Sequence, residues 1–243
     1  MNKLYVVGIG PGGRKGMTLE ADAVLAQADI IAGYTKYVEL VRPYYPDKEF
    51  FSTGMTQEVD RCRAALAFAA SGQTVAVVCS GDSGVYGMAG LLCELAGNYA
   101  STDIEIIPGV TAALSGAAIL GAPLAHDFAV ISLSDLLTPW EKIAQRLQAA
   151  AQGDFCLCLY NPGSRKRHNY MQKACDILLQ LLSSDTVCGI AKNIGRSRQS
   201  ARVMTLSQLR DTPVDMFTTV FVGNSETRNI GGKMVTPRGY GNV

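Results

Sequence analysis

The stretch Thr74-Val-Ala-Val-Val-Cys-Ser-Gly-Asp-Ser-Gly-Val-Tyr-Gly-Met-Ala-Gly90 decides the fold. Residues 74–79 form an unbroken apolar run rich in β-branched side chains, which is typical of a strand buried on both faces of a parallel sheet. Apolar residues at helical spacing follow from Ala89 to Leu95. The sequence therefore predicts a strand, a glycine loop and a helix in succession, which is the repeating unit of α/β proteins.

The loop between this strand and helix is a candidate ligand site. It contains three glycines and one carboxylate, Asp82. Ligands of open parallel sheets bind just beyond the carboxyl ends of strands, and glycines there let the backbone approach a ligand closely. Asp82 could accept a hydrogen bond from a hydroxyl or amine of that ligand. Alternatively, Gly81 and Gly84 form a turn and Asp82 caps the following helix.

Composition limits the classes of function. With 243 residues, of which 48% are hydrophobic, the chain can bury a core in one large or two small domains. Its 22 basic and 21 acidic residues leave a net charge of +1, which gives no electrostatic case for nucleic-acid binding. The sequence predicts a cytoplasmic protein without a signal peptide or membrane span. Seven cysteines, mostly in apolar patterns that include Cys93, are expected to be buried, reduced thiols, and no protein-bound metal is expected.

Strand and helix patterns alternate along the whole chain. Strands are expected at 3–9, 74–79, 104–107, 128–133, 154–159, 186–191, 202–206 and 217–222. Helices are expected at 18–28, 57–70, 89–95, from about 112, from a capping box at Thr138-Pro-Trp-Glu141, and at 165–182. We predict an α/β fold of two lobes, 1–120 with a mainly parallel sheet and 121–243 with a mixed sheet, whose ligand loops face one cleft.

The first strand leads into Gly8-Ile-Gly-Pro-Gly-Gly13, which matches the G-x-G-x-x-G pattern of dinucleotide sites. Such a site needs a helix that opens on the glycines and an acid at the end of the next strand. Here Pro11 interrupts the loop, the helix is expected only from Thr18, and Asp29 precedes the next apolar pair. A nicotinamide oxidoreductase is therefore a disfavoured alternative, and a P-loop is excluded because no G-K-[ST] follows.

No set of side chains typical of nucleophilic or paired-carboxylate catalysis is present. Neither histidine, His126 nor His168, has a serine or cysteine neighbour in a nucleophile context. Asp82 is the sole acid within the glycine loops of the first lobe. Chemistry supplied by a bound reagent fits this pattern better, and a non-catalytic nucleotide or tetrapyrrole carrier is the alternative.

Four motifs occur together and in order: Gly8-Ile-Gly-Pro-Gly12, the loop at 80–87, Pro108-Gly-Val-Thr-Ala112 and Tyr160-Asn-Pro162. Together they resemble the tetrapyrrole (corrin/porphyrin) methyltransferase family over essentially the whole chain. Segments 131–141 and 160–165 look like the branch of that family that acts on precorrin-3B or cobalt-factor III. Ser83 departs from the proline that this resemblance leads us to expect.

The resemblance implies an S-adenosylmethionine-dependent enzyme of cobalamin biosynthesis, a homodimer that methylates C17 of the macrocycle and contracts the ring. Another regiospecificity within the corrin pathway is the alternative, and the cobalt content of the substrate stays open. S-adenosylmethionine is expected in the cleft between the lobes. The donor contacts that the resemblance implies, many through the backbone, are Pro11, Ser80, Gly81, Asp82, Val85, Thr111, Ala112, Tyr160, Asn161, Asn193 and Ile194.

Two residues are candidates for the proton transfers of this reaction. Related uroporphyrinogen methylases place a base in the loop after the second strand, where this chain has Tyr34. Asp135, beside Ser134, is the second candidate. Cations expected to bind the carboxylates of the substrate are Arg14, Lys15, Lys36, Arg165 and Arg167. The two histidines are either axial contacts of a substrate cobalt or ordinary polar side chains.

Overall fold

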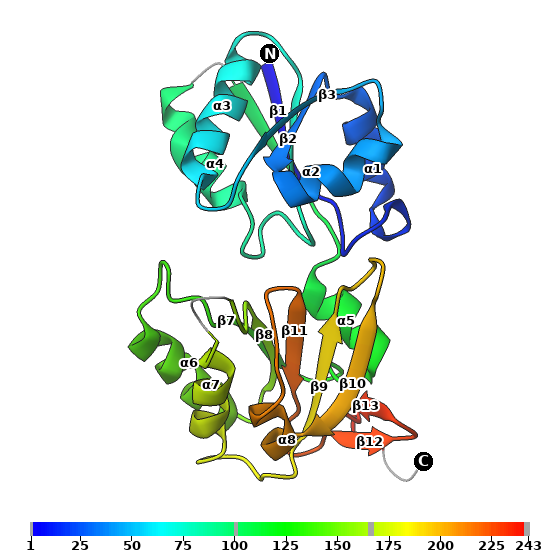
Figure 1. Ribbon diagram of the computed structural model, residues 1–243, viewed down its shortest axis with the longest axis vertical. Helices are drawn as coiled ribbons and strands as arrows, with labels where there is room; N and C mark the ends of the chain where they lie inside the picture. Colours follow the sequence, from blue (N-terminus) through cyan, green and yellow to red (C-terminus); the bar gives the residue numbers. More distant parts are fainter. Residues whose placement is uncertain (1, 100–101, 165–167, 241–243) are drawn as a thin grey trace. The chain divides into compact units, whose positions relative to one another are not determined.

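The structure is a computed structural model that describes residues 2–99, 102–164 and 168–240 (Figure 1). Backbone contacts divide the chain into two compact units, Met1–Ala112 and Ala113–Val243. The predicted lobes, 1–120 and 121–243, differ from these units by the helix after Ala112, and they stay a prediction. Within the described ranges, no helix combines the length and the apolar character needed to cross a membrane.

The first unit contains a five-stranded sheet in which every neighbouring pair is parallel, as predicted. The strand order is β3-β2-β4-β1-β5. The bounds are β1 Asn2–Gly8, β2 Ile30–Tyr34, β3 Glu49–Thr53, β4 Val75–Cys79 and β5 Thr102–Ile107. Gly8 pairs with Cys79 and Val7 with Ile107, so β1, β4 and β5 end level with one another. Three consecutive loops therefore leave the sheet side by side at its carboxyl end.

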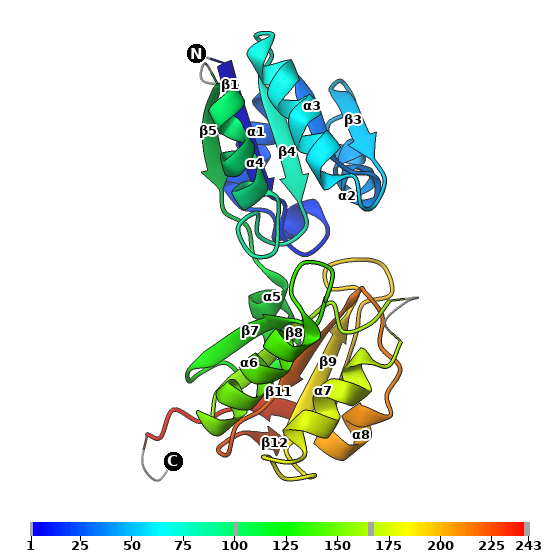
Figure 2. The same ribbon diagram turned by 90° about the vertical axis from the view of Figure 1, so that its left-hand side faces the viewer.

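Helices cover both faces of this sheet (Figure 2). Alternate residues of β4 point to opposite faces: Val75 and Val77 pack with one helix pair, and Ala76 and Val78 with the other. The whole strand is buried, which confirms the prediction made from its apolar run. The first pair is α3 Glu58–Ala70 with α4 Ala89–Leu95, and the second is α1 Leu19–Gln27 with α2 Thr35–Val41.

Helix α2 corrects one prediction. The sequence analysis placed Tyr34 in a loop after the second strand, but β2 continues to Tyr34 and α2 begins at Thr35. Val38 and Val41, three residues apart, are buried against the sheet. That single apolar stripe is enough to form a short helix, although aromatic and charged residues surround it in the sequence. Shorter 3₁₀ segments are Arg14–Gly16, Arg42–Tyr44 and Ala96–Asn98.

Hydrogen bonds of Thr18 and Asp22 fix the start of α1. The Thr18 hydroxyl accepts a hydrogen bond from the Ala21 amide at 3.0 Å, so Thr18 caps the helix that was predicted to begin there. The Arg14 guanidinium donates to both oxygens of Asp22 at 2.8 Å, and the Tyr45 hydroxyl donates to Asp22 Oδ1 at 2.6 Å. Hydrogen bonds from Arg14 first, and then from Tyr45, hold the pKa of Asp22 below its usual value.

Asp22→Asn is therefore expected to lower the melting temperature by about 2–4 °C at pH 7, because a charge-assisted hydrogen bond is lost. A carboxyl whose folded pKa is depressed stabilises the fold above its unfolded pKa of about 3.9, and this contribution disappears as the pH falls through the folded value. The difference between Asp22→Asn and the wild type should shrink below about pH 4. Thermal unfolding followed by circular dichroism between pH 3 and 7 measures it, and a difference independent of pH would contradict this account.

The second unit contains a mixed sheet, as predicted, in the order β10-β9-β11-β8-β7. Strand β11 is antiparallel to β9 and to β8, and β7 is parallel to β8. Strands β7, β8 and β9 therefore run in the same direction and end together. The bounds are β7 Phe128–Ser132, β8 Cys156–Tyr160, β9 Val187–Lys192, β10 Ser200–Thr205 and β11 Thr218–Val222.

The helices of this unit also cover both faces of the sheet. One core holds side chains of α6 Trp140–Gln152, α7 Tyr170–Leu178 and α8 Leu206–Arg210. Helix α5 Ala112–Leu120 packs on the other face, where Gly116 meets the Phe221 ring and Leu120 meets Gly189. Phe221 and Val222 follow one another in β11 and so point to opposite faces.

Three features of the second unit differ from the predictions. Pro139, with no side-chain cap bond, precedes α6, so the capping box predicted at Thr138 is wrong. A capping box does form at Thr205, where α8 follows β10 unpredicted. A small sheet of β12 Arg228–Ile230, β13 Lys233–Val235 and β6 Gly121–Ala122 was also missed. The described helix α7 lies within the predicted range 165–182, of which 165–167 lie outside the described residues.

The seven cysteines are all free, and six are buried as expected. Cys93 is exposed, which corrects the prediction for that residue, because it lies on the outer face of α4. Burial raises the pKa of the Cys79 thiol to about 11 and that of Cys158 to about 12. These thiols are therefore neutral at physiological pH and act as small apolar side chains.

Candidate functional site

Three loops meet at the carboxyl end of the first sheet, after the adjacent strands β4, β1 and β5. The Ile9 amide donates to the Cys79 carbonyl at 2.9 Å. Gly10 and Gly81 exchange two backbone hydrogen bonds of 3.0 and 2.7 Å, which form an isolated antiparallel bridge. The loops that the sequence singled out after β1 and β4 are thus joined through their backbones.

Glycines make this close approach possible. A Cβ atom on Gly8 would lie 2.6 Å from the Gly109 nitrogen, and one on Gly109 would lie 2.2 Å from the Gly81 oxygen. Gly10 has a φ of +69°, and a Cβ there would lie 2.1 Å from the Gly16 oxygen. The sequence explained these glycines by the approach of a ligand, whereas in the structure they let three loops pack against one another.

Asp82 holds two of these loops together. Its Oδ1 accepts hydrogen bonds from the amides of Gly84 at 2.8 Å and Val85 at 3.1 Å. Its Oδ2 accepts one from the Gly109 amide, 27 residues further on, at 2.9 Å. The alternative in which Asp82 caps α4 is wrong, since Met88 occupies the cap position. Asp82 instead arranges backbone amides, and its negative charge is balanced by their dipoles.

Ser83 is fully buried in the same loop. Its hydroxyl donates to the Ile107 carbonyl at 3.3 Å, which joins the loop after β4 to the end of β5. Gly87 packs against Ser83, since a Cβ on Gly87 would lie 2.3 Å from the Ser83 oxygen. The loop at 80–87 is therefore held by side-chain, backbone and packing contacts in one conformation.

The predicted donor contacts of the first unit gather at this carboxyl end. Pro11, Ser80, Asp82 and Val85 are half-buried on the loops after β1 and β4. A Cβ atom on Gly81 would lie 3.5 Å from Thr111 Cα and 3.6 Å from the Ala112 nitrogen. The 80–86 and 108–112 segments are therefore in contact, which the predicted site requires.

The predicted contacts of the second unit lie at the carboxyl ends of β8 and β9. The Tyr160 hydroxyl accepts a hydrogen bond from the Ala113 amide at 2.6 Å, so it holds the first turn of α5. Asn161 Nδ2 donates to the Ser132 hydroxyl at 2.9 Å. Asn161 and Asn193 both have left-handed backbones, with φ of +53° and +52°. Ile194 is only 8% exposed.

The two candidate proton-handling groups have defined surroundings. Tyr34 ends β2, the neighbour of β4, and its ring stands edge-on to Tyr37 with centroids 5.2 Å apart. Asp135 is exposed after β7, and its Oδ2 accepts a hydrogen bond of 2.5 Å from the Tyr170 hydroxyl. Asp135 thus has a partner that fixes its loop to α7, and both catalytic roles stay predictions.

A family model described as Tetrapyrrole (Corrin/Porphyrin) Methylases matches residues 3–210. The chain belongs to this family. A probable cobalt-factor III C(17)-methyltransferase from Salmonella typhimurium is 46% identical over 98% of this chain and 99% of its own length. A precorrin-3B C(17)-methyltransferase from a Sinorhizobium species is 40% identical over 93% of this chain and 90% of its own.

Solved structures of methylases share this fold. The crystal structure of the methyltransferase CobJ covers 98% of this chain and 100% of its own, with 39% identity and a TM-score of 0.91. A uroporphyrin-III C-methyl transferase from Thermus thermophilus, complexed with S-adenyl homocysteine, has a TM-score of 0.73 and 22% identity, covering 91% of this chain and 92% of its own. The second likeness concerns the fold alone.

The cations expected to bind substrate carboxylates differ in their availability in this methylase. Arg14 is held by both oxygens of Asp22, so it is part of the loop before α1. Lys36 forms an exposed ion pair of 2.9 Å with Glu39, and Lys15 is exposed. The remaining candidates, Arg165 and Arg167, lie outside the described residues.

Arg61 of α3 is a residue of this region that the sequence analysis missed. Its side chain is only 3% exposed, on the helix face that also buries Cys62, Ala65 and Leu66. A cation on the apolar face of a predicted helix is the signal that could have revealed it, because arginine is rarely fully buried without a reason.

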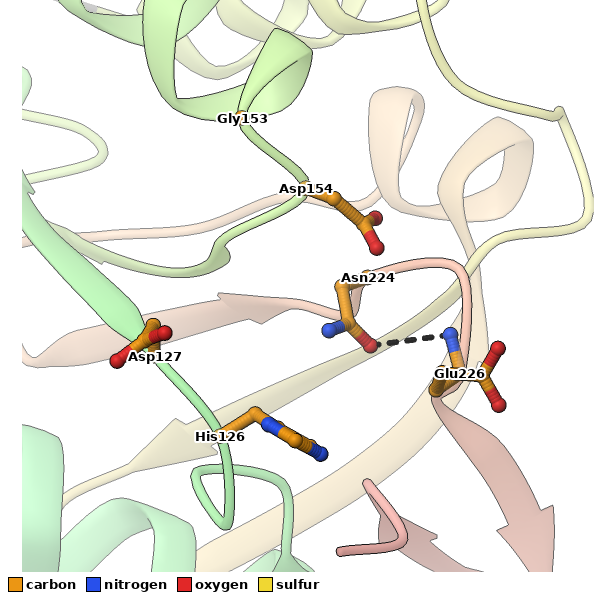
Figure 3. A pocket seen from close by; sticks show the side chains of 6 residues that line it. All are labelled: His126, Asp127, Gly153, Asp154, Asn224 and Glu226. Carbon is orange, nitrogen blue, oxygen red and sulfur yellow. Dashed lines mark hydrogen bonds between the residues drawn. The ribbon is translucent and has the colours of Figure 1, made fainter. Parts of the chain in front are cut away.

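The methylase also has a cavity of about 230 Å³ at the opposite end of the second sheet (Figure 3). It is lined by His126, Asp127, Gly153, Asp154, Asn224 and Glu226. Asp154 accepts hydrogen bonds from the amide and hydroxyl of Ser225, and Asn224 Oδ1 accepts one from the Glu226 amide. Across the described ranges, no three His, Cys, Asp or Glu side chains form a group that could hold a metal ion. These contacts stabilise turns and identify no ligand.

Proposed function

We propose that the protein transfers a methyl group from S-adenosylmethionine to C17 of precorrin-3B or cobalt-factor III and contracts the macrocycle in the same reaction. The observation that carries this proposal is the 46% identity to a probable cobalt-factor III C(17)-methyltransferase over almost the full length of both chains. The relative named precorrin-3B C(17)-methyltransferase, at 40% identity, supports metal-free precorrin-3B as the alternative substrate. The family likeness also leads us to expect a cytoplasmic protein that forms a homodimer. Light scattering of the purified protein measures the oligomeric state.

The loops of the first unit fit an adenosyl ligand. Gly84 and Gly87 are exposed, and the backbone beside them is held in place by Asp82 and Ser83. A ligand made of a nucleoside and an amino acid offers many donors and acceptors to such a backbone. We propose that the donor lies against this carboxyl end, where it contacts Pro11, Ser80, Gly81, Val85, Thr111 and Ala112.

The bound donor supplies an electrophilic methyl group on its sulfonium, so the protein needs no nucleophile of its own. Its task is to align the methyl group with C17 and to exclude water. A rigid 80–87 loop suits that task, and Asp82 contributes by fixing the amides of Gly84, Val85 and Gly109. Tyr160, Asn161, Asn193 and Ile194 are the proposed contacts in the second unit.

Ring contraction moves protons as well as carbon. We assign these transfers to Tyr34, whose phenol can donate a proton, and to Asp135, whose carboxylate can accept one. The Tyr170 hydroxyl keeps Asp135 in one orientation, which general acid–base catalysis requires.

The decisive experiment incubates the purified protein with methyl-labelled S-adenosylmethionine and, in parallel, metal-free precorrin-3B and cobalt-factor III. Mass spectrometry should show one labelled methyl group in the product, and NMR should place it on C17. A product labelled at another carbon would support a different regiospecificity, and no labelled product from either substrate would support a carrier. A change of NADH fluorescence on adding protein would revive the oxidoreductase alternative.

A further inference from the structure

Arg61 is a buried cation whose hydrogen-bond partners are all neutral. Its Nε donates to the Thr53 hydroxyl at 2.9 Å, and its Nη2 donates to the Gly54 carbonyl at 2.8 Å. Its Nη1 lies 3.7 Å from the sulfur of Met88. The guanidinium carbon is 5.9 Å from the centroid of the Tyr34 ring, at the outer limit of a cation–π contact.

Such an arrangement is costly for a residue that only fills space. Removing a guanidinium from water costs several kcal/mol unless a carboxylate balances its charge. Arg61 makes no ion pair with any carboxylate in the described part of the chain. An apolar side chain could pack against the sheet here without that cost. The charge and the planar, forked shape of arginine must therefore serve the groups that it contacts.

Those groups belong to three neighbouring strands of the sheet. Thr53 ends β3 and Gly54 follows it, Tyr34 ends β2, and Met88 closes the loop after β4. In the sheet order β3-β2-β4, these are consecutive positions at the carboxyl end. Asp82 fixes the beginning of the 80–88 loop to the segment after β5. Arg61 fixes the last residue of the same loop to the segment after β3.

We propose that Arg61 is a positioning residue for methyl transfer, which fixes the end of the 80–88 loop and the ring of Tyr34. The inference rests on the proposed function, in which the 80–88 loop contacts the methyl donor and Tyr34 transfers a proton. Lysine cannot replace arginine here, since one ammonium group cannot reach Thr53, Gly54 and Met88 together. The role depends on the forked shape as well as the charge.

The test compares Arg61→Lys and Arg61→Met with Arg63→Lys and Arg63→Met, since Arg63 is exposed on the same helix. For each protein, the melting temperature, the affinity for S-adenosylhomocysteine, and kcat and KM for both substrates are measured. Arg61→Lys should remain folded and lose about tenfold in kcat/KM, with part of the loss in KM for S-adenosylmethionine; tenfold corresponds to about 1.4 kcal/mol. Both Arg63 variants should stay within twofold of the wild type.

A lower melting temperature of Arg61→Lys with kcat and both KM values unchanged would overturn the inference, because Arg61 would then only support the fold. Arg61→Met should lose at least as much activity as Arg61→Lys, and if it fails to fold, Arg61→Lys alone decides. The wild-type arm separates the two proposals. A wild-type protein that methylates neither substrate contradicts the proposed function, whereas an active wild type with fully active Arg61 variants contradicts only the role of Arg61.

Discussion

Asp82→Asn is expected to weaken S-adenosylhomocysteine binding by at least about tenfold. The carboxylate accepts from three amides, two at Oδ1 and one at Oδ2. Asparagine keeps the size of the side chain but replaces one oxygen with an NH₂ group, which would face the amide of Gly109 or those of Gly84 and Val85. An amide left without an acceptor in a half-buried loop costs about 1–3 kcal/mol, and 1.4 kcal/mol is tenfold in affinity.

Isothermal titration calorimetry with the wild type and the variant measures this effect. Asp103→Asn is the matched control, because Asp103 is exposed near the start of β5 and so lies far from the carboxyl end of the sheet. The control should bind as tightly as the wild type. An unchanged affinity of Asp82→Asn would remove the carboxylate from the ligand site and leave it as a local feature of the turn.

The position of Asp82 could be predicted from the sequence, but its partners could not. A buried strand followed by glycines places the residue at the carboxyl end of a sheet whatever the strand order is. The contact with Gly109 depends on β4 and β5 both being neighbours of β1. A single sequence contains no direct signal for that order, so the sequence analysis offered a ligand or a helix cap as the partner.

Arg61 shows a second limit of sequence reasoning. Helix α3 was predicted correctly from its apolar spacing, and in such a pattern a cation is normally placed on the solvent side. Arg61 is nevertheless buried, because the loops after β3 and β4 place two oxygen atoms and a sulfur atom within hydrogen-bond reach of its guanidinium. These acceptors come from two separate segments, so the helical pattern can place Arg61 on the apolar face but cannot predict its partners.

Short elements were missed for a related reason. Helix α8 and the strands β6, β12 and β13 have between two and five residues each. Periodicity has too few repeats to be recognised over such lengths, and these elements form only where a neighbour completes their hydrogen bonds. The strands of the two main sheets have only five to seven residues, but most of them contain apolar runs, which is why fold class and the direction of the first sheet were predicted correctly.

Gly109→Ala is expected to have the largest effect on stability and donor binding. The added methyl group would lie 2.2 Å from the Gly81 oxygen and 2.6 Å from the Gly8 carbonyl, and both contacts are with backbone. No rotamer change can relieve them, so the three loops must separate, and overpacking of this kind costs about 3 kcal/mol or more. The melting temperature should fall by at least about 6–12 °C, and S-adenosylhomocysteine binding should be lost.

Gly90→Ala is the matched control for this substitution. Gly90 lies on α4 in the same unit, and a Cβ there would have no neighbour within 4 Å. Alanine in a helix is favoured over glycine by about 0.5–1 kcal/mol, so Gly90→Ala should raise the melting temperature slightly and bind the ligand like the wild type. If Gly109→Ala also bound normally, the loops could adapt to an added methyl group, and the donor site would not depend on their close packing. Loss of binding in Gly109→Ala but not in Gly90→Ala would mean that the ligand binds only when the glycines at the carboxyl end of the sheet let the three loops pack closely.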